Sequence, residues 1–167
     1  LCNALEEKIE KGADFVCPAC SGAVRFKKGK VMQPHFAHVS LEECRFYREN
    51  ESAEHLNLKA ELFRWAVQTE EVEVEAFLPA LQQIADLLVD GKLALEVQCS
   101  PLSIERLQER TFSYRQHGYQ VLWLLGRKLW LKDSLTRLQK DFLYFSKNMG
   151  FHLWELDQEK QVLRLKS

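Results

Sequence analysis

Residues 83–98 read Gln-Ile-Ala-Asp-Leu-Leu-Val-Asp-Gly-Lys-Leu-Ala-Leu-Glu-Val-Gln. An Asp-Gly pair at positions 90 and 91 separates two apolar runs of strand length, and this pattern predicts a tight β-hairpin. Asp86 on the first run and Glu96 on the second are therefore expected on paired strands. Both could be ordinary charges on a half-exposed hairpin. A charge such as Glu96 inside an apolar strand is unfavourable when unpaired, however, and this favours a shared site.

Carboxylate oxygens held on a rigid sheet suit Mg²⁺ or Mn²⁺, whose remaining positions are left to water and phosphate. Gln98 follows Glu96 by two residues, so the two side chains are expected on the same face of the strand. The sequence thus presents an Asp-x9-Glu-x-Gln constellation. Two such carboxylates would repel each other unless a cation neutralised them, which supports a metal site.

A helix is predicted over residues 51–68, where apolar side chains recur with helical spacing and form one broad face. Glu51, His55 and Lys59 follow each other at intervals of four and make a stripe inside that face. Taken singly, Lys59 is more simply explained by a stem that carries its ammonium to solvent, and His55 by a satisfied core histidine. Together with the acids of the hairpin, the stripe favours a site that these side chains share.

The rest of the pattern alternates strands and helices. Strands are predicted near residues 72–78, 83–89, 93–99, 119–125, 151–157 and 161–166, and helices near 103–117 and 134–146. The run 119–125 is apolar throughout, as expected for a central strand, and the helix before it predicts a parallel crossover. We therefore predict an α/β domain over residues 49–167, with a mixed sheet flanked by helices.

Residues 1–48 are predicted to form a separate small unit. The stretch 15–46 is basic and rich in turn residues, with a small hairpin expected around Lys28-Gly29. So short a segment buries too little apolar surface to fold without a metal or a disulfide. Five candidate ligands follow a C-x2-C…H-x2-H…C pattern: Cys17, Cys20, His35, His38 and Cys44.

Four of these ligands are predicted to bind one structural Zn²⁺: Cys17, Cys20, His38 and Cys44. His35 could replace His38 or point toward DNA. A redox-active C-x2-C pair is the alternative, but the βαβ pattern that accompanies such motifs is absent from this stretch.

The net charge of −1 hides an uneven distribution. Residues 51–100 carry three Lys or Arg against ten Asp or Glu, whereas residues 101–150 carry nine against four. An acidic segment followed by a basic one suits a protein that holds a divalent cation beside a polyanion. One face of the predicted helix 103–117 either binds a phosphate backbone or forms a solvated surface, and it carries Ser103, Arg106, Arg110, Ser113 and His117.

No run is long and apolar enough to span a membrane, and nothing resembles a signal peptide, so a cytoplasmic protein is expected. In a reducing compartment, the cysteines are better explained by metal ligation than by a disulfide framework. The chain starts at Leu1 rather than Met, so we expect it to be part of a longer protein.

Several motifs occur together between about residue 15 and about residue 126: Cys17-Pro-Ala-Cys, Pro34-His-Phe-Ala-His, Glu51-Ser-Ala-Glu-His-x3-Lys, Ala85-Asp, Glu96-Val-Gln-Cys-Ser and Arg110-x3-Tyr-x4-Tyr-Gln-Val-Leu-Trp-Leu-Leu. This combination resembles the bacterial CoiA competence family, and the Asp-x9-Glu-x-Gln core resembles that of PD-(D/E)xK nucleases. The resemblance implies a zinc-finger-like segment ahead of a restriction-endonuclease-like domain. It also implies a cytosolic role in natural transformation and recombination of incoming DNA.

The resemblance further implies that Asp86 and Glu96 hold Mg²⁺ or Mn²⁺, and that Gln98 takes the position where many such nucleases carry Lys. We expect the Val97 carbonyl to be a further ligand of the cation, and Gln98 to orient the attacking water.

The helical stripe is expected to complete the chemistry. Lys59 would stabilise the charge that develops on the phosphate, and His55 or Glu51 would assist proton transfer. The predicted function is a metal-dependent nuclease acting on single- or double-stranded DNA, with recombination proteins as further partners. The alternatives are a non-catalytic DNA-binding recombination mediator with a degenerate nuclease fold, and a protein-interaction scaffold.

Overall fold

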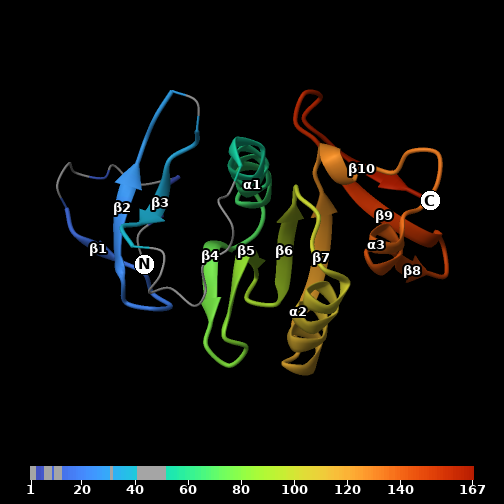
Figure 1. Cartoon of the computed structure of the whole chain (residues 1–167), viewed down its shortest axis with the longest axis horizontal. Helices are drawn as coiled ribbons and strands as arrows, with labels where there is room; N and C mark the ends of the chain where they lie inside the picture. The colour runs from blue at the N-terminus through green and yellow to red at the C-terminus, as the bar shows by residue number, and fades with distance from the viewer. Residues whose placement is uncertain (1–2, 6–8, 10–12, 31, 41–51) are drawn as a thin grey trace.

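The computed structural model describes residues 3–5, 9, 13–30, 32–40 and 52–167. Within these residues the chain forms a small N-terminal sheet and a large sheet, and Figure 1 shows them side by side, with β9 and β10 at the far end of the large sheet. The strands of the large sheet are β4 (Val72–Leu78), β5 (Gln83–Val89), β6 (Leu93–Gln98), β7 (Gln120–Leu125), β8 (Tyr144–Ser146), β9 (Gly150–Asp157) and β10 (Val162–Lys166).

The large sheet is mixed. Its order is β10-β9-β7-β6-β5-β4, and β8 pairs with β9. Strand β5 pairs antiparallel with both β4 and β6, whereas β7 pairs parallel with both β6 and β9. The predicted mixed α/β sheet is therefore confirmed, and so is the parallel crossover that joins β6 to β7 through a helix.

The helices are α1 (Ala53–Ala66), α2 (Ile104–Gln116), the 3-10 turn η1 (Arg127–Leu129) and α3 (Arg137–Asp141). Helices α1 and α2 cover opposite faces of the sheet. Leu58 of α1 packs in one apolar cluster with Leu124, whereas Leu107 of α2 packs in another with Trp123. Because Trp123 and Leu124 are neighbours on β7, they point to opposite faces. None of the described helices is both long and apolar enough to span a membrane.

A serine cap starts each of the two long helices. Ser52 Oγ accepts a hydrogen bond from the backbone N–H of His55 at 3.1 Å, and Ser103 Oγ accepts one from Arg106 at 3.2 Å. Such caps satisfy one of the N–H groups that a helix leaves without an internal partner. The cap of α1 fixes His55 in the first turn of the helix.

The turn between β5 and β6 has the predicted Asp-Gly geometry. Asp90 and Gly91 have φ values of +49° and +62°, and the N–H of Lys92 donates to the carbonyl of Val89 at 3.0 Å. The last strand pair away from this turn is Leu87 opposite Leu95. Asp86 and Glu96 follow directly after this pair, where the ladder between β5 and β6 ends.

The predicted helix over residues 134–146 is wrong in extent. Helix α3 has five residues, and β8 follows it and pairs with β9. Tyr144 anchors β8, because its hydroxyl accepts from the N–H of Trp123 at 2.7 Å and donates to the carbonyl of Val121 at 3.3 Å. Burial raises the pKa of Tyr144 to about 12, so the hydroxyl keeps its proton at neutral pH. The other predicted elements of the large domain begin and end within two residues of their observed bounds.

The small sheet consists of β1 (Phe15–Val16), β2 (Ala23–Lys27) and β3 (His35–His38), all antiparallel. The ring of Phe36 packs against Phe15, with 4.9 Å between ring centroids, and against Phe26, with 5.6 Å. The expected hairpin around Lys28-Gly29 is present, because β2 pairs with β3. Arg64 of α1 donates to the Gln33 side chain at 3.1 Å and so joins the small unit to the large one.

The hairpin turn yields a test of the fold. Replacing Gly91 with Ala should lower the free energy of unfolding by about 1 to 2 kcal/mol, because an L-residue is strained at positive φ. Nothing lies within 4 Å of the added Cβ, so the loss reports backbone strain alone. Gly29→Ala is the matched control, since its Cβ would also meet open space but φ is not in the left-handed region. Urea unfolding measures both variants, and equal stabilities would contradict this account.

Candidate active site and metal centre

Asp86 lies where β5 and β6 separate. The residue is 3% exposed, and its Oδ2 accepts a hydrogen bond from the backbone N–H of Val97 at 2.9 Å. The same oxygen lies 3.1 Å from Nε2 of His55 in the first turn of α1. The side chain of Asp86 therefore replaces a backbone partner in the sheet and links β6 to α1.

Glu96 is 1% exposed and faces the other helix. Its Oε1 accepts hydrogen bonds from the Tyr114 hydroxyl and from Nη2 of Arg110, both on α2. From the sequence, mutual repulsion of the two acids was expected to require a bound cation. The chain itself supplies a positive charge to Glu96 through Arg110, so Glu96 has a compensating charge without a bound cation. Asp86 is contacted separately, by His55 of α1 and the backbone N–H of Val97 on β6.

Lys59 is 4% exposed, and its Nζ lies 2.9 Å from Oε1 of Glu75 on β4. Glu75 has a φ of +52° in the middle of that strand, and it lies between the strand pairs Val74–Leu87 and Ala76–Ala85. Positive φ at a non-glycine residue inside a strand is strained, and such strain concentrates at functional sites.

Glu75 is the residue that the sequence reasoning missed. In the alternating run Val72-Glu-Val-Glu-Ala, Glu73 and Glu75 look alike and would both be assigned to a solvent face. The left-handed backbone turns Glu75 toward α1 and leaves Glu73 exposed. No local sequence signal marks that difference.

Two of the other predicted residues, Gln98 and Val97, are described by the structure, and two are not. Gln98 is partly exposed, and its side-chain amide donates to the carbonyl of Ser100 at 2.7 Å. Val97, whose carbonyl is an expected ligand, is 4% exposed. Glu51 and Cys44 lie outside the described residues.

A cleft of about 500 Å³ opens where α1 and α2 begin and β6 ends. Its walls include His55 and Gln98, and three cationic side chains also line it: Arg106, Arg110 and Lys128. None of the described residues that line it is acidic. We call this hollow the basic cleft.

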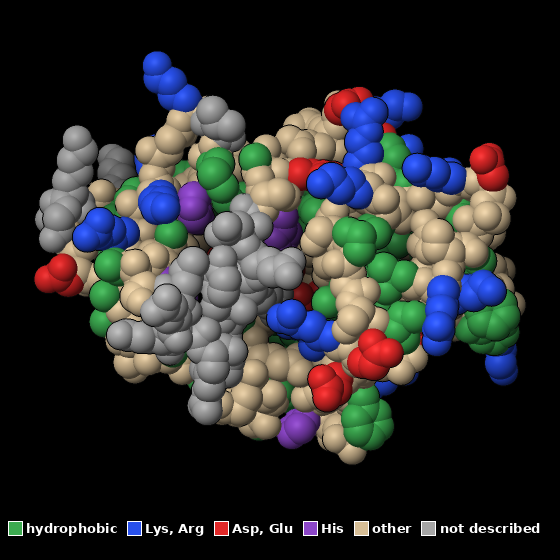
Figure 2. Space-filling model, viewed as in Figure 1, with side chains coloured by type: hydrophobic (Ala, Val, Ile, Leu, Met, Phe, Trp, Pro, Cys, Tyr) green, Lys and Arg blue, Asp and Glu red, His purple; other side chains and the backbone are tan. Residues whose placement is uncertain are grey.

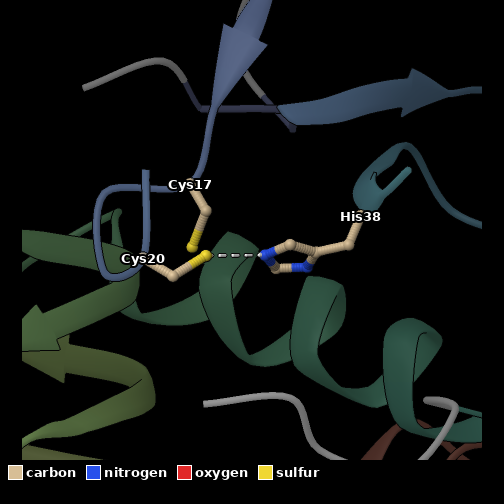
Figure 3. A group of neighbouring side chains, drawn as sticks. All are labelled: Cys17, Cys20 and His38. Carbon is tan, nitrogen blue, oxygen red and sulfur yellow. Dashed lines mark hydrogen bonds between the residues drawn. The ribbon is translucent and has the colours of Figure 1, made fainter. Parts of the chain in front are cut away.

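The small N-terminal sheet holds a second group of ligands. One sulfur or nitrogen atom from each of Cys17, Cys20 and His38 lies within 4.8 Å of the others, and Figure 3 shows the three side chains turned toward one point. Sγ of Cys20 lies 3.4 Å from Nε2 of His38, and the N–H of Gly22 donates to the same sulfur at 3.4 Å. This group could hold a metal ion.

His38 belongs to this group, whereas His35 has other partners. His35 points elsewhere: its Nδ1 lies 2.8 Å from the carbonyl of Gln33, and its ring borders a small cavity shared with Lys59. Burial raises the pKa of the Cys17 thiol above its ordinary value, whereas a cation at the sulfur would favour the thiolate.

Comparisons with known proteins give two family matches. The family described as "Competence protein CoiA, nuclease-like domain" matches residues 51–167, and "Competence protein CoiA, N-terminal domain" matches residues 3–47. The chain is 32% identical over 159 residues to the Competence protein CoiA of Bacillus subtilis strain 168. That match covers 93% of this chain and 40% of the relative, so the chain spans well under half of the relative's length.

No solved structure matches the chain. Both family matches and the relative carry the same family name. The chain therefore belongs to the competence protein CoiA family, and its larger part is the nuclease-like domain of that family.

Proposed function

We propose that this chain hydrolyses phosphodiester bonds in DNA with Mg²⁺ or Mn²⁺, in the cytoplasm and in the service of transformation and recombination. One observation carries the proposal. Two buried carboxylates, Asp86 and Glu96, stand on adjacent strands at the point where those strands separate. Carboxylate and carbonyl oxygens are the donors that these hard cations prefer, so the residues fit the cation.

In this proposal, Asp86, Glu96 and the Val97 carbonyl hold the cation. When bound, the cation would neutralise phosphate oxygens and lower the pKa of a water molecule. Gln98 orients that water from the rim of the basic cleft. The sequence of this chain lacks the Lys that nucleases of this type often carry at the position of Gln98.

Helix α1 supplies the remaining groups. His55 takes or returns a proton, and its contact with Asp86 supports that role. Glu51 is the alternative proton carrier. Lys59 places its charge near the phosphate, and Glu75 holds the ammonium in position.

A non-catalytic recombination mediator is the second candidate, and a specific observation favours it. The Glu96 carboxylate already accepts from Arg110 and Tyr114, and its side chain is 1% exposed. A carboxylate so engaged must exchange partners before it binds a cation. A protein that keeps the fold and the DNA surface without turnover would tolerate this arrangement.

Basic side chains support DNA as the partner in both cases. Figure 2 shows Lys and Arg side chains at both ends of the visible face, over the small sheet and toward β9 and β10. Exposed cations of the small sheet and its hairpin are Arg25, Lys27, Lys28 and Lys30. Such side chains contact phosphates without reading sequence, so they are compatible with single- or double-stranded DNA.

The nuclease proposal is tested with Asp86→Ala and Glu96→Gln. Both should abolish Mg²⁺- or Mn²⁺-dependent cleavage of DNA while DNA binding persists, because the Lys and Arg side chains that attract phosphate remain in place. Glu96→Gln should also lower the melting temperature, since it removes the charge that Arg110 faces. Glu73→Gln, an exposed acid on β4, is the control that should leave cleavage and melting temperature unchanged.

A wild-type protein that binds DNA, cleaves it with neither cation and shows no Mg²⁺-dependent rise in melting temperature would exclude the nuclease. That result would establish the mediator as the better account.

We also propose that the Cys and His group of the small sheet binds a structural Zn²⁺, with Cys44 as the fourth ligand. The donors fit, because thiolates and imidazole favour Zn²⁺ in tetrahedral sites. With bonds of about 2.3 Å, ligand atoms in such a site lie about 3.8 Å apart. The spacing of the Cys17, Cys20 and His38 atoms is compatible with that value.

Elemental analysis of purified protein should find about one Zn²⁺ per chain. Cys20→Ser and Cys44→Ser should each lower the zinc content and expose the small sheet to proteolysis, because a metal-stapled segment unfolds without its ion. Cys99→Ser, at a buried cysteine of the large domain, should keep the zinc. Full resistance to proteolysis in a zinc-free preparation would refute the structural role.

A further inference from the structure

The basic cleft receives the N-terminal ends of two helices. Ser52, the cap of the 14-residue α1, and Ser103, the cap of the 13-residue α2, both line it. The first N–H groups of a helix lack internal partners, and the helix dipole adds a partial positive charge at that end. Two such ends facing one hollow attract an anion more strongly than either alone.

Charged side chains reinforce that potential. Arg106 and Arg110 reach the cleft from α2, and Lys128 reaches it from η1. Within the described part of the chain, neither Arg106 nor Lys128 has an acidic group within 4.0 Å. Their charges are therefore not neutralised by described neighbours. The volume of the cleft, about 500 Å³, is that of a site for a nucleotide-sized ligand.

Arg110 shows unused hydrogen-bonding capacity at this place. Its Nη2 donates to Glu96, but its Nε is buried and has no hydrogen-bond partner among the residues that the structure describes. A buried donor without a partner is unfavourable, and a guanidinium offers five N–H groups in a fixed fork. The side chain also lies over the ring of Trp123, with 5.7 Å between Cζ and the ring centroid.

We propose that the basic cleft binds a phosphate group of the DNA strand, separate from the phosphate that is cut. Arg106 and Lys128 carry most of the electrostatic attraction, and Arg110 lies between the bound phosphate and Glu96. This inference rests on the proposed action on DNA and adds a second phosphate site to it. A terminal phosphate and an internal phosphodiester share the required chemistry, so the experiment distinguishes them.

The test measures binding without any divalent cation, so that it does not depend on cleavage. The probes are short single-stranded DNA oligonucleotides labelled at the 3′ end, with either a 5′-phosphate or a 5′-hydroxyl. Fluorescence anisotropy over a series of salt concentrations gives the affinity and its salt dependence for wild type, Arg106→Gln and Lys128→Gln. Arg115→Gln is the matched control, because Arg115 is an exposed arginine of the same helix that does not line the cleft.

Each cleft variant should weaken binding roughly tenfold, as expected for loss of one charge-assisted contact. It should also reduce the slope of log affinity against log salt by about 0.7, the value for one phosphate contact on a single strand. Arg106 and Lys128 are exposed, so melting temperatures should stay at the wild-type value. Arg115→Gln should change neither quantity to that extent.

The two probes separate the sources of the phosphate. A loss confined to the 5′-phosphorylated strand identifies a terminal phosphate, and an equal loss for both strands identifies an internal one. Wild-type affinity in both cleft variants, or a loss no larger than that of Arg115→Gln, overturns the inference even if the protein cleaves DNA. Weaker binding by the cleft variants of a protein that never cleaves DNA keeps the phosphate site and rejects the nuclease. A wild type that binds neither probe overturns both.

Discussion

A buried carboxylate needs a compensating charge, and the pairing of Glu96 with Arg110 meets this requirement at the centre of the domain. Glu96 stands in β6 among apolar neighbours, so the helix that brings Arg110 and Tyr114 must cross that face of the sheet. The crossover from β6 to β7 carries that helix, and the parallel pairing of the two strands follows from it. The basic cleft then forms where the same helix begins.

A second constraint acts on the opposite face. Glu75 and Asp86 fall in the same gap in the ladder between β4 and β5, and both side chains turn to α1. The strained backbone at Glu75 is compatible with a folded sheet because the side chain pairs with the buried Lys59. The proposed site therefore draws on both faces of the sheet. His55 and Lys59 belong to α1, whereas Arg110 belongs to α2.

Much of this arrangement could be predicted from local sequence. The Asp90-Gly91 turn, the order of strands and helices and the ionisable stripe of α1 depend on periodicity and turn chemistry, which act over a few residues. The pairing of Arg110 with Glu96 could not, because its helix face reads equally well as a solvated surface. The contact of Glu75 with Lys59 could not be predicted either, because it depends on the positive φ of Glu75. The apolar spacing around Phe142 looked helical, but hydrogen bonds of Tyr144 to distant β7 stabilise a strand there.

Arg110 pairs with Glu96 and also lines the basic cleft. The charge at Glu96 and the binding of an anion in the cleft therefore affect each other. A guanidinium shared between two anions divides its hydrogen bonds between them. An anion in the cleft therefore weakens the hold of Arg110 on Glu96, and a positive charge placed at Glu96 frees Arg110 for the cleft. Thermodynamic reciprocity requires the two effects to be equal in free energy. A single side chain can thus couple the occupancy of one pocket to the electrostatic state of the other.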